Sequence, residues 1–344
     1  MAGNLYLPDG FSEGRSYPAI VSVHPGGGVK EQTVSLYAGK LAREGFVTLA
    51  FDASHQGESG GQACHLENPA SRVEDIRSAA DYLSTLGYVD ADRIGVLGIC
   101  AGAGYAVNAT MTDRRIKAVG TVSPIDIGAA YRLGWDGCEP VATQLATLDA
   151  VAKQRAAEAQ GADAAHVPYV PETVDETTVP DMAEAHDYYR TPRAQHPRSD
   201  NRMLFTSVAN IYAFDAFHQV ETLLTQPLLM VACSKVRLSV AGRAAAAAGE
   251  QPQGAGRHRR RRTRLPLRRP RIRRPGDDPP VTVLHEVPLT RRRPGGEKEA
   301  KEMKTSVTFS GVGAATAAPH SVAVVSVPDA LPASHWSHPR LKSA

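Results

Sequence analysis

The feature that most constrains the fold is an apolar run that ends abruptly in small residues and continues at once into a second apolar segment. Residues 93–99 are predicted to form a buried strand and residues 101–110 a helix, so the turn between them is very tight. Gly98 and Gly102 remove Cβ atoms that would collide within such a turn. A strand that turns into a helix through small-x-nucleophile-x-small predicts a nucleophile elbow, with Cys100 as the nucleophile.

The position of Cys100 at the predicted start of a helix bears on its chemistry. Free N–H groups and the positive end of the helix dipole would face the sulfur and favour thiolate over thiol. A buried structural cysteine in an apolar strand is the alternative, because free cysteines are among the most buried residues.

A glycine-rich loop follows an earlier predicted strand over residues 19–24. Residues 25–28 read Pro-Gly-Gly-Gly and expose backbone N–H groups. Such a loop can form one half of an oxyanion hole, and the N–H of Ala101, just after the nucleophile, can form the other half. A flexible turn and a phosphate-binding loop are alternatives, although the Lys-Ser/Thr ending of a phosphate loop is missing.

Predicted strands and helices alternate along the first part of the chain. The strands cover 19–24, 46–51, 93–99, 116–124 and 227–233, and the helices between them cover 33–44, 68–86 and 101–110. Strands that are apolar throughout predict a mostly parallel sheet covered by helices on both faces. Between these βα units lies a mostly helical insertion at about 130–225, called the cap here, with predicted helices over 142–160, 179–190 and 210–224. Tyr188 and Tyr189 of the cap could line a pocket or simply pack between helices.

The composition changes abruptly near residue 235. From 236 to 344 there are 21 Lys and Arg against 8 Asp and Glu, and residues 257–274 contain 11 Arg interleaved with Pro. We predict a low-complexity, disordered tail there. One hypothesis is that a shifted reading frame in a GC-rich gene produced it, which translation of the other two frames would test. A basic tail that binds nucleic acid is the rival, but it lacks interleaved aromatic residues.

Four stretches together resemble a known family. They are HPGGGVKEQT at 24–33, FDASHQGESGG at 51–61, GICAGAGY at 98–105 and YYRTPRA at 188–194. The chain resembles the dienelactone-hydrolase-like α/β-hydrolases over residues 1–235, within a Cys-nucleophile branch that includes polyketide acyltransferases. The resemblance implies an α/β-hydrolase fold, a nucleophile at Cys100, and oxyanion donors at Gly27, Gly28 and Ala101.

The same resemblance raises the question of the other catalytic groups. A hydrolase of this kind needs a His to take the thiol proton and a carboxylate to orient that His. The carboxylate is expected just after the strand over 227–233, yet the first one there is Glu250. Asp126, at the end of the preceding strand, is the candidate acid in an alternative placement, and His285, in a strand-like stretch, is the candidate base.

These features predict a hydrolase that acts on an ester, lactone or thioester through a covalent acyl-enzyme. An acyltransferase to an alcohol acceptor, or an impaired enzyme that lacks its C-terminal His and acid, are the alternatives. We expect a small-molecule acyl substrate, no cofactor or metal, no membrane partner and no nucleic-acid partner. The four widely spaced cysteines indicate reduced thiols, and no apolar run is long enough to cross a bilayer, so we expect a cytoplasmic protein.

Overall fold

The computed structural model describes residues 1–135, 137–233 and 322–327. The chain divides into two units, a first unit of residues 1–250 and 317–344 and a second unit of residues 251–316. Every described residue belongs to the first unit. The predicted tail at 236–344 lies outside the described residues, apart from one short strand at 322–327.

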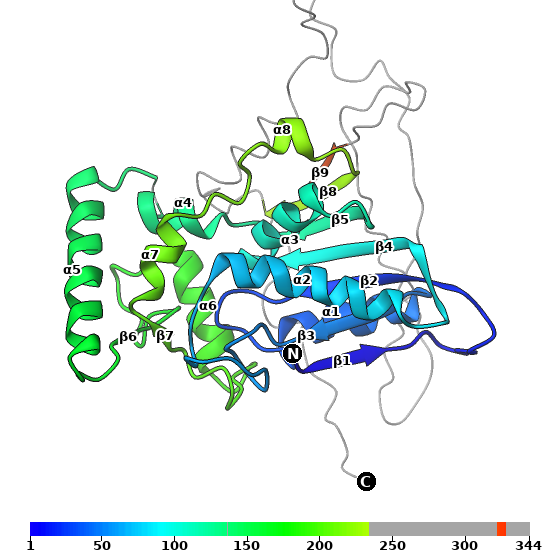
Figure 1. Ribbon diagram of the computed structural model, residues 1–344, viewed down its shortest axis with the longest axis horizontal. Coiled ribbons are helices and arrows are strands. Elements are labelled where there is room, and N and C mark those ends of the chain that lie inside the picture. The colour runs from blue at the N-terminus through cyan, green and yellow to red at the C-terminus, as the bar shows by residue number, and fades with distance from the viewer. Residues whose placement is uncertain (136, 234–321, 328–344) are drawn as a thin grey trace, which may run out of the picture. The chain divides into compact units, whose positions relative to one another are not determined.

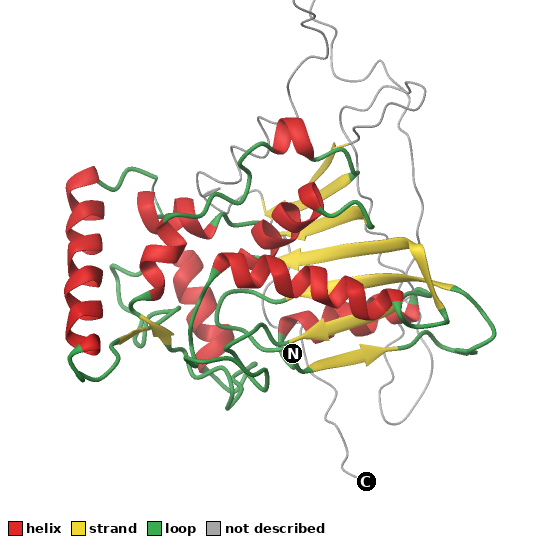
Figure 2. Ribbon diagram, viewed as in Figure 1, coloured by secondary structure: helices red, strands yellow, loops and turns green. Residues whose placement is uncertain are grey.

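A seven-stranded sheet forms the centre of the first unit (Figure 2). Its strands, in spatial order, are β1 (Gly3–Tyr6), β3 (Val47–Phe51), β2 (Tyr17–Val23), β4 (Val89–Ile99), β5 (Ile116–Val122), β8 (Leu228–Cys233) and β9 (Val322–Val327). Only the pairing of β1 with β3 is antiparallel, and all other neighbours in the sheet are parallel. The predicted mostly parallel sheet is confirmed.

Strand β9 was not predicted. It pairs in parallel with β8, from Leu228 beside Val322 to Cys233 beside Val327. The run Val-Ala-Val-Val-Ser-Val is rich in β-branched residues, which favour strands. The bias toward Arg and Pro in the preceding residues puts this stretch in the predicted disordered tail, and for residues 322–327 that prediction is wrong.

Helices cover both faces of the sheet, as the apolar strands predict. Strand β3 is buried along its whole length, and its alternate side chains enter two clusters. Leu49 and Phe51 pack in the large cluster with α2 (Pro69–Ser84) and α3 (Ala101–Thr112). Ala50 faces the other way, where it packs with α1 (Thr33–Arg43).

The cap, apart from its last helix α8 (Val220–Leu223), which packs near α3, lies beyond the carboxyl ends of the parallel strands (Figure 1). Its elements are α4 (Ile127–Leu133), α5 (Val141–Ala159), β6 (His166–Val167), α6 (Pro180–Arg190), β7 (Met203–Leu204), α7 (Ser207–Tyr212) and α8 (Val220–Leu223). Strands β6 and β7 form a small antiparallel sheet. Ligands of open α/β sheets bind at this end of the strands, so the cap stands over the expected site.

The predicted helix over 210–224 is wrong, because the chain forms α7 and α8 with an irregular segment between them. The Arg132 guanidinium donates hydrogen bonds to the carbonyls of Tyr212 and Phe214, which takes these acceptors out of a continuing helix. Gln219 then adopts a left-handed conformation with φ of 66°. The spacing of apolar residues cannot predict a hydrogen bond from a side chain that is distant in the sequence.

Candidate active site

The turn at Cys100 has the strained geometry of a nucleophile elbow. Cys100 lies between β4 and α3 with φ of 57° and ψ of −124°, a conformation that L-residues rarely adopt. A Cβ on Gly98 would lie 2.4 Å from the Gly102 carbonyl oxygen, and one on Gly102 would lie 2.5 Å from the His24 carbonyl oxygen. Both positions therefore require glycine, as the sequence predicts.

Backbone hydrogen bonds fix this turn to the neighbouring strand. The Cys100 N–H donates to the Val122 carbonyl at 3.0 Å, and the Ile125 N–H donates to the Cys100 carbonyl at 3.1 Å. Residues at and just after the end of β5 thus bond both the N–H and the carbonyl of Cys100. The surrounding structure stabilises a conformation that the isolated turn would not keep.

Burial dominates the electrostatics of the thiol. It raises the pKa of Cys100 to about 11, while the Ala101 N–H and the charge of Arg72 act in the opposite direction. The helix start does favour thiolate, as predicted, but the loss of solvent outweighs it. In the free protein the thiol keeps its proton near neutral pH, so reaction needs a base.

The glycine loop, residues 25–28, follows β2 and runs beside the elbow. Gly27 has φ of 67°, and an ideal Cβ on Gly26 would lie 3.8 Å from the Ala101 Cβ. The Gly28 N–H already donates to the Pro25 carbonyl at 3.2 Å. The predicted donors Gly27 and Ala101 therefore lie on adjoining segments, whereas the Gly28 N–H is engaged in a turn.

His24 supports the glycine loop and is not placed to serve as a base. Its Nδ1–H donates to the Pro25 carbonyl at 2.7 Å, and its Nε2 accepts the Ala53 N–H at 3.1 Å. Burial first, and the charge of Arg72 second, lower the pKa of His24 well below its usual value. The ring is therefore neutral, and both its nitrogens are occupied.

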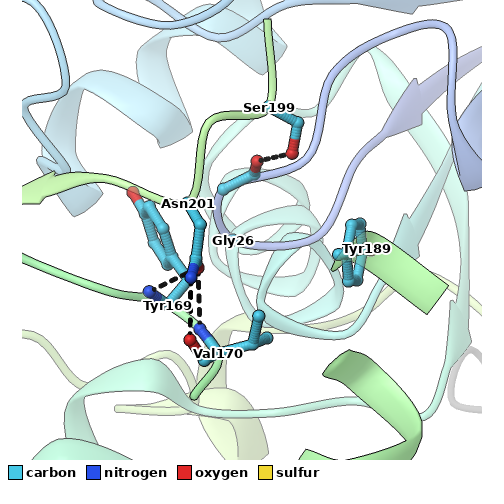
Figure 3. A pocket seen from close by; sticks show the side chains of 7 residues that line it. Gly26, Tyr169, Val170, Tyr189, Ser199 and Asn201 are labelled. Carbon is cyan, nitrogen blue, oxygen red and sulfur yellow. Dashed lines mark hydrogen bonds between the residues drawn. The ribbon is translucent and has the colours of Figure 1, made fainter. Parts of the chain in front are cut away.

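A small cavity lies between the glycine loop and the cap (Figure 3). Its lining residues are Gly26, Gly27, Tyr169, Val170, Tyr189, Ser199 and Asn201. The Ser199 hydroxyl donates to the Gly27 carbonyl at 2.7 Å. Figure 3 shows Tyr169 and Tyr189 on opposite sides of the cavity. Burial, and then the neighbouring Cys100, raise the pKa of Tyr189, which therefore keeps its hydroxyl proton.

Known proteins share the sequence and the fold of this chain. The model of the dienelactone hydrolase family matches residues 1–169. The chain is 48% identical over 231 residues to "Uncharacterized protein YcjY" of Escherichia coli K12, covering 67% of this chain and 76% of that protein. The chain belongs to the dienelactone hydrolase family. Membership supports an enzyme with a hydrolase or acyl-transfer role that acts on a small molecule.

Two further proteins are similar to this member of the dienelactone hydrolase family. The crystal structure of hypothetical protein PA2218 from Pseudomonas aeruginosa matches with a TM-score of 0.68 and 34% identity, covering 73% of this chain and 78% of that one. "Polyketide transferase claH" of Penicillium crustosum is 34% identical over 126 residues, which cover 36% of this chain and 40% of claH. The family and its α/β-hydrolase fold are thus as the motifs imply.

Of the predicted acid and base, the structure describes only Asp126. Asp126 follows β5 and caps α4, where its Oδ1 accepts the Ala129 N–H at 3.2 Å, and burial raises its pKa. His285 lies outside the described residues. Within residues 1–135 and 137–233, no hydrogen bond joins the Cys100 thiol to a histidine.

A buried ion pair that the sequence did not reveal lies beneath the glycine loop. Arg72 Nε lies 3.7 Å from Glu67 Oε1, and both side chains are almost fully buried. Around the pair lie Gln56, Tyr105 and Tyr169, which all donate to the Glu67 carboxylate. We call these five residues the inner network. No local spacing rule predicts it, because Tyr169 lies 102 residues from Glu67.

A second set of charges joins the residues just after the glycine loop to the cap, and we call it the outer network. It consists of Lys30, Glu31, Asp52, Glu58 and Arg198. Lys30 Nζ contacts all three carboxylates, and Arg198 of the cap contacts Glu31 at 2.8 Å and Glu58 at 2.7 Å. Burial acts to lower the pKa of Lys30, but the carboxylates outweigh it and raise that pKa.

Two searches of the described residues gave negative results. No described helix is long and apolar enough to cross a membrane. In the same part of the chain, no three His, Cys, Asp or Glu side chains are grouped so that they could hold a metal ion.

Proposed function

We propose that this protein is an acyl hydrolase that uses Cys100 as its nucleophile on an ester, lactone or thioester. The observation that carries the proposal is the strained turn at Cys100, which presents the thiol at the start of α3 beside the glycine loop. Backbone N–H groups of Gly27 and Ala101 are the proposed oxyanion donors. Such donors act most strongly in a site from which water is excluded.

The proposed reaction has two stages. A base takes the thiol proton, Sγ bonds to the acyl carbon, and the carbonyl electrons move to the oxygen held by the N–H groups. This tetrahedral intermediate then collapses, which restores the carbonyl and breaks the bond to the leaving alcohol or thiol. The leaving group takes the proton from the base. Water then repeats the sequence on the acyl-enzyme and releases the acid and free Cys100.

The base and the acid belong to the proposal as well. His285 is the proposed base and Asp126 the proposed acid that orients it, although Asp126 also caps α4. A base is essential here because the half-buried thiol, with a pKa of about 11, is almost wholly protonated at neutral pH. An enzyme that lacked both groups would retain only the contribution of the oxyanion hole and binding.

The test is acylation by p-nitrophenyl acetate, followed by release of p-nitrophenol and by intact mass. We expect a single acyl adduct on the wild type, none at this site in Cys100→Ala, and no change in Cys64→Ala. Cys64 is the matched control because it is an exposed free cysteine. Adduct formation at the wild-type rate in Cys100→Ala would remove the basis of the proposal.

Acyl transfer to an alcohol is the second candidate. The similarity to claH, whose name describes a polyketide transferase, favours it. In the lining of the cavity, the hydroxyl oxygens of Ser199 and Tyr189 are the groups proposed to bind an acceptor hydroxyl. Adding a primary alcohol to the acyl-enzyme distinguishes the two, because a transferase gives a new ester at the expense of free acid.

We also propose a reducing, cytoplasmic location. Cys64, Cys100 and Cys138 are all free thiols, and two of them are exposed. Exposed thiols persist where glutathione and thioredoxin keep cysteines reduced.

A further inference from the structure

The ring of Tyr169 lies directly on the glycine loop. A Cβ on Gly27 would lie 2.5 Å from Tyr169 Cδ2, and one on Gly26 would lie 3.4 Å from the same ring. Tyr169 belongs to the cap, in the segment between β6 and α6. The cap therefore limits where the peptide of Gly27, a proposed oxyanion donor, can move.

Tyr169 is itself fixed at both ends. Its hydroxyl donates to Glu67 Oε2 at 2.7 Å and accepts from Gln56 Nε2 at 3.1 Å. Its backbone N–H donates to Asn201 Oδ1 at 3.0 Å. The Tyr169 ring cannot swing away from Gly27 without breaking the charge-assisted hydrogen bond from its hydroxyl to Glu67.

The anchor of the Tyr169 hydroxyl also holds the strand that leads into the glycine loop. Glu67 is fully buried, and its partner Arg72 donates from Nη2 to the His24 carbonyl at 2.9 Å. One buried ion pair thus reaches the residue before the loop through Arg72 and the ring above the loop through Glu67. Buried carboxylates this well satisfied have little freedom to move.

We propose that Tyr169 is a positioning residue for the oxyanion site: Glu67 anchors its hydroxyl, and its ring holds the Gly27 peptide in place beside Ala101. The inference rests on the proposed function, since it assigns Tyr169 a role in the same acylation step. Tyr169 acts through the loop and forms no bond to the substrate. The cap is then part of the catalytic geometry as well as a cover over it.

The test compares two reactions of Cys100 that differ in their need for an oxyanion site. Acylation by p-nitrophenyl acetate passes through an oxyanion, whereas alkylation by iodoacetamide displaces iodide and forms none. The variants are Tyr169→Leu, which removes the ring, Tyr169→Phe, which removes only its hydroxyl, and Tyr105→Phe as the matched control. Tyr105 donates to the other oxygen of Glu67 at 2.8 Å, but its ring packs in the core.

We expect acylation of Tyr169→Leu to fall about 10²-fold, the effect of roughly 1 Å of misplacement, and that of Tyr169→Phe to fall about tenfold. Alkylation of Cys100 should stay within about threefold of wild type in every variant, a change too small to reflect the misplacement that costs 10²-fold. Tyr105→Phe loses a similar hydrogen bond to Glu67 but keeps the Tyr169 ring and its hydroxyl anchor, so its acylation should fall less than that of Tyr169→Phe. Hydrogen exchange at residues 26–29 should accelerate in Tyr169→Leu and not in Tyr105→Phe.

The outcomes separate the inference from the function beneath it. Equal losses of acylation and alkylation, or unchanged acylation in Tyr169→Leu, would overturn the positioning role while Cys100 remained the nucleophile. A wild type that iodoacetamide alkylates at Cys100 but no ester acylates would overturn the proposed function, and the positioning role with it.

Discussion

The inner network bonds His24, just before the glycine loop, whereas the outer network contains Lys30, just after it, and the two networks differ in their exposure to solvent. In the inner network, Glu67 and Arg72 are 0% and 3% exposed at their side chains. The outer network begins at buried Lys30 and ends at Glu58 and Arg198, which are 44% and 40% exposed. Breaking a buried ion pair costs much free energy of unfolding, because it leaves a charge without solvent or partner. An ion pair exposed to water contributes little and can break and re-form.

The largest expected effect comes from breaking the inner network. Arg72→Gln leaves Glu67 as an uncompensated buried charge, so we expect a loss of about 3–5 kcal/mol in the free energy of unfolding. Urea denaturation at neutral pH measures it. A loss below about 1 kcal/mol, the size of an exposed pair, would remove the distinction between the two networks.

A smaller effect is expected on the thiol. Because the pKa of Cys100 is raised to about 11, its alkylation rate should keep climbing with pH between 7 and 10 as thiolate forms. Arg72→Gln removes a charge that lowers this pKa, so its profile should move to higher pH by up to about one unit, or ~1.4 kcal/mol.

Arg198→Ala is the matched control for that profile, because it removes a cation of the outer network instead. It should leave the profile of Cys100 in place, since Arg198 is not among the charges that act on the thiol. A shift toward lower pH in Arg72→Gln, or an equal shift in both variants, would contradict the assignment.

The smallest effect is expected at the exposed end of the outer network. Arg198→Ala should cost less than about 1 kcal/mol, and this cost should shrink as salt screens the partly exposed pairs. Thermal unfolding of wild type and variant in low and high NaCl measures the difference. A loss that salt does not reduce would mean that the charges of the outer network are as well shielded from solvent as those of the inner network.

The sequence predicts best what depends on neighbours in the chain. Gly98 and Gly102 identify the elbow because they flank Cys100 in sequence, and the glycine loop is likewise a run of adjacent residues. The contact that requires Gly102, with the His24 carbonyl, comes from a distant segment. Glu67, Arg72 and Tyr169 escape notice because their contacts join distant segments and follow no spacing rule. His285 and Asp126 stay predictions.

The cap shows the same limit. The long helix α5 follows directly from its composition, while the break between α7 and α8 depends on Arg132, some 80 residues earlier. A side chain from a remote element can end a helix that propensity alone would continue. Local patterns thus predict the scaffold, and long-range polar contacts shape the site on it.

The hydrogen bonds between the cap and the glycine loop segment have a consequence for modularity. Ser199 bonds the Gly27 carbonyl, and Gln32 Nε2 bonds the Ala194 carbonyl at 2.8 Å. The cap therefore cannot be exchanged as a self-contained insert. A chimera that imports a foreign cap should also import that protein's residues at positions 27–32, so that both sides of the seam come from the same parent.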